Sequence, residues 1–292
     1  MELRVLKYFL AAAREQNITA AAETLHITQP TLSKQLKELE EELGKKLFIR
    51  GNRKITLTEE GMFLRKRAQE IVELADKTAA DFAAGIDAVS GDIFIGSGET
   101  GAVRYIGRAL YKMRSRYPDI RFHLFSGNGE DVSERLDKGL IDFALFVGLT
   151  DLRKYDYLKL PYHHKWGLVM RADDPLAAHE HITPEMLTNV PILCSRQALI
   201  RSELSGWLGR PFDELNVVGT YNLIYNAAIM VEEGLGHALC IDKLLDTPES
   251  RGLCFRPLEP VIHAELFVAW KKYQFFSAAA GKFLEMLQHE LE

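Results

Sequence analysis

The sequence predicts an α/β protein that carries a separate helical module at its N-terminus, and three observations support this. Apolar residues recur every three to four positions through the first ninety residues, which is typical of amphipathic helices. After Ser90-Gly91 the pattern changes to short apolar runs that alternate with helical segments, which predicts βα units. The chain has 292 residues, 47% hydrophobic and 26% charged, so it is long enough for more than one globular domain.

Charge is divided unevenly along the chain. The formal net charge is −5, but residues 1–67 hold 13 Lys and Arg against 9 Asp and Glu, whereas the remainder holds 23 against 32. A basic module on an acidic body is typical of nucleic-acid binders. No apolar run of about 18 or more residues occurs, and the first residues lack the apolar segment of a secretory signal. The sequence therefore predicts a cytoplasmic protein with no membrane partner.

The N-terminal module has the pattern of a helix-turn-helix. A first helix is marked by an apolar stripe, and a second, short helix covers Thr19 to Leu25. The third helix has Thr28 as its N-cap and Pro30 in its first turn, and it ends at Gly44. A short helix, a tight connection and a longer helix with one basic face are the parts of a DNA-reading helix-turn-helix. The apolar stripes are Leu3, Leu6, Leu10 and Ala13 in the first helix, and Leu32, Leu36, Leu39 and Leu43 in the third.

A basic hairpin and a long helix follow. Two short β-like runs, Leu47 to Ile49 and Ile55 to Leu57, flank a Gly-Asn turn, which predicts a wing. From Thr58 a helical pattern runs to about Asp87. Its apolar positions alternate four- and three-residue steps, which predicts a dimer interface, with an ordinary helix packed on its own domain as the alternative. The seam residues are Leu64, Ala68, Ile71, Ala75, Thr78 and Phe82.

The remaining two thirds of the chain predict two doubly wound α/β lobes. In open α/β sheets ligands bind beyond the carboxyl ends of the strands, so we expect a binding cleft between the lobes. Strands are expected at Asp92 to Gly96, Ile120 to Phe125, Ile141 to Val147, Gly167 to Arg171, Pro191 to Ser195, Asn216 to Gly219, His237 to Ile241 and His263 to Trp270, and helices at Ala102 to Arg116, Glu130 to Lys138 and Ala278 to Leu291.

Residues 1–66 resemble the winged helix-turn-helix of the LysR-type transcriptional regulators. The resemblance lies in Thr19-Ala20-Ala21-Ala22, Leu25, Thr28-Gln29-Pro30, Leu32-Ser33, Leu36, Leu39-Glu40, Leu43-Gly44, Leu47-Phe48, Arg50, Arg53 and Leu57-Thr58-Glu59-Glu60-Gly61. Thr28 stands where the family usually has Ser, and Leu32 and Leu36 replace the usual Val and Ile, without changing a physical role. Residues 91–292 resemble the effector domain of the family more weakly, through length, βα order, Tyr117-Pro118-Asp119 and Gly139-Leu140-Ile141-Asp142.

This resemblance implies a bacterial, sequence-specific transcription regulator that is not an enzyme. Its subunits would form a homodimer or homotetramer through the linker helix and bind an imperfect inverted repeat in double-stranded promoter DNA, with RNA polymerase as a further expected partner. A small molecule between two lobes like those of type 2 periplasmic binding proteins would shift the assembly. The implied domains are 1–57 for the winged helix-turn-helix, 58–90 for the linker helix and 91–292 for the effector domain, with lobe I at 91–161 and 268–292 and lobe II at 162–267.

Candidate DNA-binding residues lie at the start and on the exposed face of the third helix and in the wing. Gln29 is the best candidate for an adenine edge, whereas Ser33 and the lysines are as well suited to phosphates, which position a protein without specifying sequence. The alternative for all of them is generic surface. The set is Thr28, Gln29, Pro30, Thr31, Ser33, Lys34, Lys37, Arg50, Arg53 and Lys54.

Candidate effector-binding residues follow the strand ends. The N–H groups of the Ser97 to Gly101 stretch and the Thr100 hydroxyl would hold an anion, unless Thr100 is only an N-cap. Arg196 would hold a carboxylate, or else form a structural ion pair, while Glu99 argues against a strongly anionic ligand. The set is Ser97, Gly98, Thr100, Ser126, Asn128, Phe146, Ser195, Arg196, Tyr221 and Asn222.

One motif favours a different function. Gly96-Ser97-Gly98-Glu99-Thr100-Gly101 matches G-x-G-x-x-G, so the alternative is an NAD(P)-dependent oxidoreductase that uses the GSGETG loop. That fold needs an acid at the end of the next strand, where this chain has Ser126-Gly127-Asn128. We otherwise find no pattern for catalytic residues, a metal site or a cofactor. Three widely spaced cysteines exclude a disulfide framework, and Cys194 leaves a redox sensor open.

Overall fold

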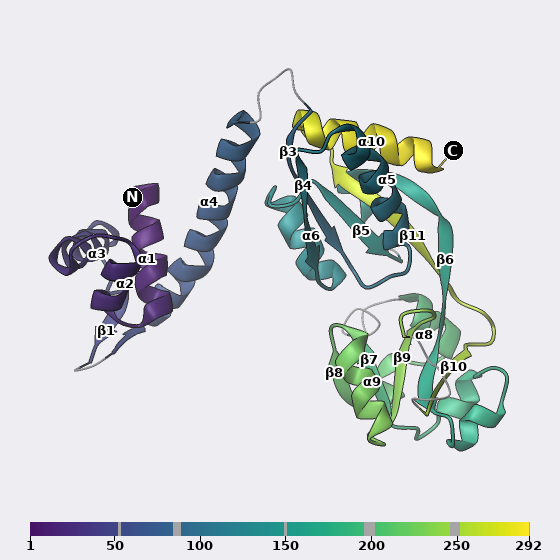
Figure 1. The fold of residues 1–292 in the computed structure, drawn as a ribbon. Helices are drawn as coiled ribbons and strands as arrows, with labels where there is room; N and C mark the ends of the chain where they lie inside the picture. Colours follow the sequence, from purple (N-terminus) through teal and green to yellow (C-terminus); the bar gives the residue numbers. More distant parts are fainter. Residues whose placement is uncertain (52–53, 84–88, 149–150, 196–201, 246–251, 292) are drawn as a thin grey trace. The chain divides into compact units, whose positions relative to one another are not determined.

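The computed structural model describes residues 1–51, 54–83, 89–148, 151–195, 202–245 and 252–291, without the side chains of 50, 81, 83, 202 and 203. The chain divides into two units, Met1–Ala83 and Ala84–Glu292 (Figure 1). Within the described ranges, no helix is long and apolar enough to cross a membrane.

The first unit is a winged helix-turn-helix followed by a long helix, as the sequence predicts. Local hydrogen bonds explain where its helices begin: the Asn17 side chain accepts from the Thr19 and Ala20 N–H groups, Thr28 accepts from Thr31, and Thr58 accepts from Gly61. The elements are α1 Leu3–Glu15, α2 Ile18–Thr24, α3 Gln29–Leu43, the antiparallel strands β1 Phe48–Arg50 and β2 Ile55–Leu57, and α4 Glu59–Ala83.

A buried carboxylate joins α3 to the wing. Glu40 is only 6% exposed, and it accepts hydrogen bonds from Leu47 N at 2.8 Å, Phe48 N at 3.2 Å and Lys46 Nζ at 2.9 Å. Burial alone raises the pKa of the Glu40 carboxyl, but these bonds outweigh it and hold the pKa below its ordinary value. The start of β1 is therefore fixed to the helix that carries the candidate DNA-reading residues.

The structure of α4 differs in part from the predicted dimer interface. Leu64 is 8% exposed and Ala68 is fully buried, because both pack into the core of the first unit with residues of α1 and α3. The prediction was therefore wrong for these two residues, which are not available to a second chain. Ile71 and Phe82 are 41% and 85% exposed, and Phe63 and Leu74 are also exposed. Thr78 is exposed and Ala75 half-buried. The predicted helix ran to Asp87, but residues 84–88 lie outside the described ranges.

The second unit contains two lobes built on one nine-stranded sheet with the order β4-β3-β5-β11-β6-β9-β7-β8, and β10 pairs with β6. Lobe I contains β3 Gly91–Ser97, α5 Val103–Arg116, β4 Ile120–Ser126, α6 Gly129–Asp137, β5 Phe143–Val147 and α10 Ala278–Leu291. Lobe II contains β7 Ile192–Ser195, α8 Ser202–Leu208, β8 Val217–Tyr221, α9 Ile224–Glu232, β9 His237–Ile241 and β10 Leu253–Pro257. Short 3₁₀ turns lie at η1 Leu152–Lys154, η2 Pro175–Ala178, η3 Pro184–Leu187 and η4 Phe212–Glu214.

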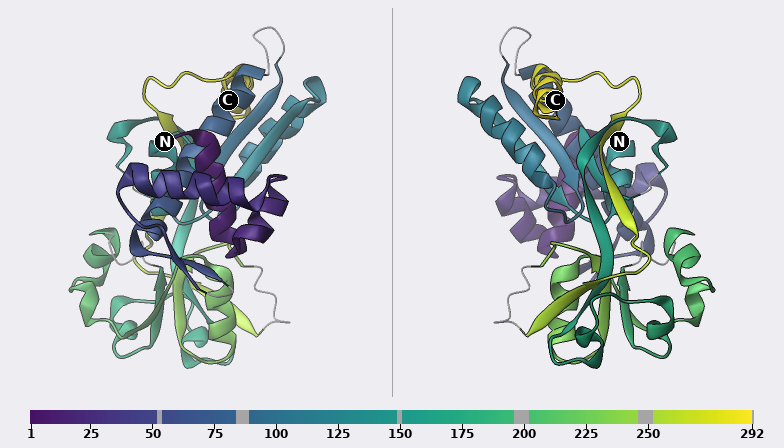
Figure 2. Two further views of the ribbon diagram at one scale, coloured as in Figure 1. Left: turned by 90° about the vertical axis from the view of Figure 1, so that its left-hand side faces the viewer. Right: turned by 90° about the vertical axis from the view of Figure 1, so that its right-hand side faces the viewer.

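Two long strands, β6 Tyr155–Arg171 and β11 His263–Lys271, run from one lobe into the other (Figure 2). In lobe I, β3, β4 and β5 are parallel, with α5 and α10 packed on one face of the sheet and α6 on the other. Strand β11 is antiparallel to both β5 and β6, and β6 is antiparallel to β9 and β10, so the sheet is mixed rather than parallel throughout. The lobes are thus joined by two paired strands.

The strand predictions differ from the structure mainly where side chains are polar. The first half of β6, with Asp156, Lys159 and the adjacent His163 and His164, was not predicted, because its polar residues hid the strand pattern. Strand β10 was also not predicted. It holds Arg256, whose guanidinium donates to the carbonyls of Ala177 and His179.

We expect Glu40→Gln to loosen the wing, because the neutral amide replaces a buried carboxylate that accepts three hydrogen bonds. Such bonds are worth about 1–3 kcal/mol. Hydrogen exchange of peptides covering residues 45–57 measures the effect, with Glu41→Gln as an exposed control. In the wild type the pKa of Glu40 is lowered in the folded state, so its contribution is present above the ordinary value of 4.5 and is lost as the pH falls through the folded pKa. Equal protection in both variants would contradict this role.

Candidate functional sites

Helix α3 presents a polar face opposite a buried apolar one. Leu32, Leu36 and Leu39 are buried, whereas Gln29, Pro30, Thr31, Lys34 and Lys37 are exposed and Ser33 is half-buried. The Thr28 hydroxyl lies 2.8 Å from that of Thr31, so both belong to the cap of the helix. Lys34 and Lys37 are paired one turn later with Glu38 and Glu41, at 3.7 and 3.3 Å, on the exposed surface. Such surface pairs are weak, so a phosphate competes with them at little cost.

The wing is a short antiparallel hairpin in which Ile49 pairs with Thr56 and Arg50 with Ile55. Lys54 is exposed, and its carbonyl accepts a hydrogen bond from Gly51 N at 2.9 Å. The side chain of Arg50 and the whole of Arg53 lie outside the described residues. Gly61 lets the wing approach α4, because a Cβ there would lie 2.2 Å from the Leu47 carbonyl oxygen.

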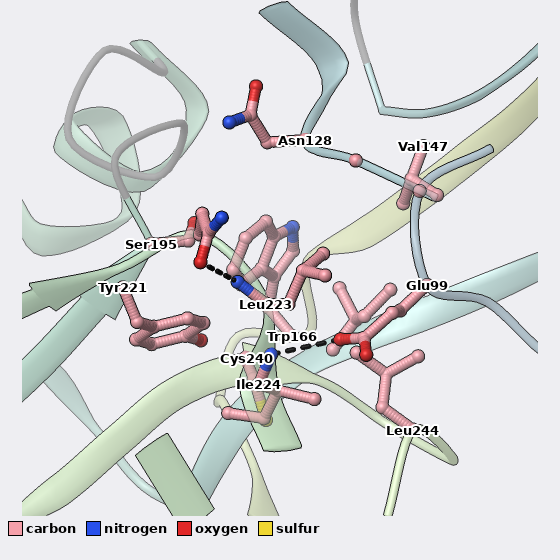
Figure 3. A pocket seen from close by; sticks show the side chains of 14 residues that line it. Glu99, Asn128, Val147, Trp166, Ser195, Tyr221, Leu223, Ile224, Cys240 and Leu244 are labelled. Carbon is pink, nitrogen blue, oxygen red and sulfur yellow. Dashed lines mark hydrogen bonds between the residues drawn. The ribbon is translucent and has the colours of Figure 1, made fainter. Parts of the chain in front are cut away.

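The two lobes enclose a cavity of about 80 Å³ (Figure 3). Five of the predicted effector residues line it: Gly98 and Asn128 from lobe I, and Ser195, Tyr221 and Asn222 from lobe II. Ser97, Thr100 and Ser126 line a neighbouring pocket of about 360 Å³ instead. Arg196 lies outside the described residues.

Phe146 was wrongly predicted to face the cleft. It is 1% exposed and packs with Val132, Leu136 and Tyr155 beneath α6. Successive residues of a strand point to opposite faces, and it is the next residue, Val147, that lines the cavity. The predicted strand end, Val147, is correct, but the choice of Phe146 as the cleft residue was off by one position, which is enough to reverse the face.

Thr100 takes part in a buried chain of hydrogen bonds between the lobes. Its hydroxyl accepts from Ala102 N at 3.1 Å and lies 2.7 Å from Nε2 of His164, a fully buried residue of β6. Nδ1 of His164 lies 2.7 Å from the Asp242 carboxylate. Burial raises the pKa of Asp242, but the hydrogen bonds from His164 and Lys165 N lower it by more than burial raises it. The pKa of Asp242 is therefore below its ordinary value. The Thr100 hydroxyl therefore binds the turn just before α5 and holds His164.

Glu99 forms the second link between the lobes. Its Oε2 accepts a hydrogen bond from Ile224 N at 2.9 Å, at the first residue of α9. Leu223, the N-cap of α9, gives no side-chain cap, so the carboxylate of lobe I caps a helix of lobe II. Sequence reasoning missed this contact, as it missed His164 and Asp242, because each partner lies far away along the chain.

Tyr221 offers its ring rather than its hydroxyl to the cavity. The hydroxyl donates to the Leu239 carbonyl at 2.7 Å, and burial raises its pKa well above the ordinary value. On the other side, the Asn128 side chain accepts from Glu130 N and Asp131 N and donates to Asp131. Both residues are therefore held in place before any ligand arrives.

Comparison with known proteins identifies the family. Residues 3–62 match the family described as bacterial regulatory helix-turn-helix protein, lysR family, and residues 87–292 match the LysR substrate binding domain. The chain belongs to the LysR family of transcriptional regulators. It is 30% identical to the Hca operon transcriptional activator HcaR of Escherichia coli, over all of this chain and 98% of that one. It is 27% identical to the regulator YvbU of Bacillus subtilis, over 98% and 97% of the two chains.

Solved structures show the same fold. Full-length CbnR in complex with its target DNA superimposes with a TM-score of 0.73 at 20% identity, over 99% of this chain and all of that chain. A full-length OxyR variant from Pseudomonas aeruginosa gives 0.56 at 22% identity, over the whole of both chains. This LysR-family chain is thus a DNA-binding transcription regulator with an effector-binding domain, and its relatives are regulators rather than enzymes.

The oxidoreductase alternative finds no support in these comparisons. The first glycine of its fingerprint has another explanation in the fold. A Cβ at Gly96 would lie 2.6 Å from Ile141 and 3.0 Å from Val132, so this glycine lets β3 approach the residues around α6. Glu99, inside the fingerprint, is bound to the opposite lobe.

The cysteines provide a test of the redox hypothesis. Cys194 and Cys240 are 0% and 4% exposed, and they belong to two different hydrophobic clusters of lobe II. Burial raises the pKa of Cys194 to about 12 and also raises that of Cys240. Thiolates, not thiols, react with disulfides and peroxide. We expect a thiol reagent at neutral pH to label half-buried Cys254 first in the native protein, and Cys254→Ser to abolish that labelling. Rapid labelling or peroxide oxidation of Cys194 in the native state would contradict this expectation.

Proposed function

We propose that this LysR-family regulator inserts α3 into the major groove of promoter DNA and lays the wing against the backbone. The observation that supports this proposal most strongly is the exposed face of α3. Gln29, Lys34 and Lys37 lie on this face, and the opposite face of the helix is buried in the core of the first unit. Glu40 holds the wing against the same helix, so Lys54 is presented together with α3. Arg50 and Arg53 complete the proposed contacts.

The proposal extends to a homodimer or homotetramer that binds two half-sites of an inverted repeat in the bacterial cytoplasm, where the chromosome lies. Exposed apolar surface supports assembly with further copies. On α4 it comprises Phe63, Ile71, Leu74 and Phe82. On lobe I, an apolar pocket of about 640 Å³ lies along α5 and β4, beside Tyr111, Phe122 and Leu124. On lobe II, α9 and β8 expose Val218, Tyr225, Ile229 and Met230.

An effector in the inter-lobe cleft would then bias the arrangement of the lobes. Residues of both lobes line the cavity, and one of them is Glu99, which links the lobes through Ile224 N, so a ligand there meets both lobes. A ligand shifts such an equilibrium only through a difference in its affinity for the two arrangements. The role requires no catalytic residue, metal or cofactor, and contact with RNA polymerase rests on the family resemblance alone.

We expect Gln29→Ala to change base preference at one operator position, because a glutamine pairs with an adenine edge. Discrimination at that position should fall by about 1–3 kcal/mol. Fluorescence anisotropy with a panel of operator variants measures this. Lys54→Ala is the matched control, since loss of a phosphate contact should weaken all sequences and reduce the salt slope by about one. Equal losses on every DNA for Gln29→Ala would show that Gln29 does not read a base.

We expect Ile71→Asp to weaken self-association, because it places a charge on the exposed apolar stripe of α4. The dimer dissociation constant should rise by about tenfold or more. Sedimentation equilibrium measures the constant, and circular dichroism checks the fold. Arg65→Asp, on a different exposed face of α4, is the control and should leave association unchanged. Unaltered association in Ile71→Asp would exclude this stripe as the interface.

A further inference from the structure

The charge inside the inter-lobe cavity indicates the class of the effector. Among the described residues that line it, Glu99 is the one with a charged side chain. The others are apolar, aromatic or neutral and polar, and they include Trp166, Tyr221, Val147, Leu223 and Leu244. The cation Lys243 lines the neighbouring pocket, and its Nζ lies 3.9 Å from the Asp242 carboxylate. The described part of the lining therefore carries one negative charge in an apolar setting.

The position suited to a ligand anion is already filled by the chain itself. A helix N-terminus attracts anions, and the first N–H of α9 donates to Glu99. A ligand carboxylate in this cavity would lie beside the Glu99 carboxylate, and two like charges in a partly buried site repel each other. Binding a carboxylate therefore means displacing Glu99 from α9.

A cationic ligand faces no such conflict. A carboxylate has about four acceptor positions, and the bond from Ile224 N uses one of them. An ammonium group can add further charge-assisted hydrogen bonds to Glu99 without removing it from α9. The faces of aromatic rings such as Trp166, which is 5% exposed, also attract cations. The cavity has a volume of about 80 Å³ and a mainly apolar lining, which suits a short apolar tail.

We propose that the inter-lobe cavity takes a small organic cation, with an ammonium group paired to Glu99 and a short apolar tail against Trp166. The inference rests on the proposed role of the cleft as the effector site. It replaces the carboxylate ligand that Arg196 suggested from the sequence. It is independent of DNA recognition, so promoter binding by the ligand-free protein tests the proposed function separately.

The test compares two ions of similar shape and opposite charge, butylammonium and butyrate, at equal ionic strength. Thermal unfolding of the full chain should shift upward by several degrees with saturating butylammonium and remain unchanged with butyrate. Calorimetric titration then gives the dissociation constants. Glu99→Gln keeps an acceptor oxygen for Ile224 N and removes the charge, so it should weaken butylammonium binding by about tenfold or more.

Two further variants provide the controls. Glu180→Gln removes a carboxylate whose side chain is 94% exposed in lobe II, and it should bind butylammonium like the wild type. Arg196→Ala instead tests the carboxylate alternative that the sequence suggested. Absence of a response to butylammonium, or equal binding by wild type and Glu99→Gln, overturns the proposal. A response to butyrate that is lost in Arg196→Ala also overturns it and restores the carboxylate as the ligand class.

Discussion

The antiparallel pairing of β6 with β11 is the constraint on which the effector-binding unit depends. Leu160 of β6 and Leu266 of β11 belong to the core of lobe I, whereas Trp166 and Ala264 belong to that of lobe II. The register shifts between Glu265 and Phe267, opposite a stretch of β6 that contains Pro161. Proline has no N–H to give to a ladder, so an irregularity is expected there. The two strands carry the chain between the lobes at the irregular point of the sheet.

This strand pair also determines which side chains meet across the cleft. His164 follows closely after Pro161 on β6, and from there it reaches Thr100 of lobe I and Asp242 of lobe II. The chain of bonds is fully buried at His164, so removal of one partner would leave an unsatisfied polar group in the interior. The Glu99 link differs, because it lies at the cavity itself and ends on a half-buried carboxylate. The first link therefore supports the arrangement of the lobes in which these bonds exist, and the second is the one that a ligand contacts.

The sequence was sufficient to predict those structural features that depend on residues close together in the chain. Thr28 and Thr58 cap their helices, Gly44 ends α3 in a left-handed conformation, and β1 pairs with β2 as a hairpin, because each depends on a few neighbouring residues. The heptad spacing of apolar residues in α4 is likewise present in the sequence. However, spacing alone does not reveal that Leu64 and Ala68 pack on α1 and α3 while Ile71 and Phe82 remain exposed.

The position of the cleft could be predicted from the sequence, but most of the contacts within it could not, because they too depend on non-local packing. The predicted strand ends indicated which loops border the cleft. Whether Phe146 or Val147 faces the cleft, however, depends on a single residue of register. The contacts of Glu99, Thr100 and Tyr221 join segments that are distant along the chain, so no local pattern encodes them. Glu99 was noted in the sequence as unfavourable for an anion, yet its partner on α9 emerges only from the fold.

Ligand charge and lobe arrangement are therefore coupled through one carboxylate. A cation that pairs with Glu99 adds to the bond with Ile224 N and so stabilises the arrangement of the lobes in which that bond exists. An anion has to break the same bond and thus favours separation of Glu99 from α9. Each 1.4 kcal/mol of difference in binding free energy between two arrangements changes their ratio about tenfold. Since one charge-assisted hydrogen bond is worth about that much, the sign of the ligand charge at Glu99 is enough to decide which arrangement of the lobes the effector favours.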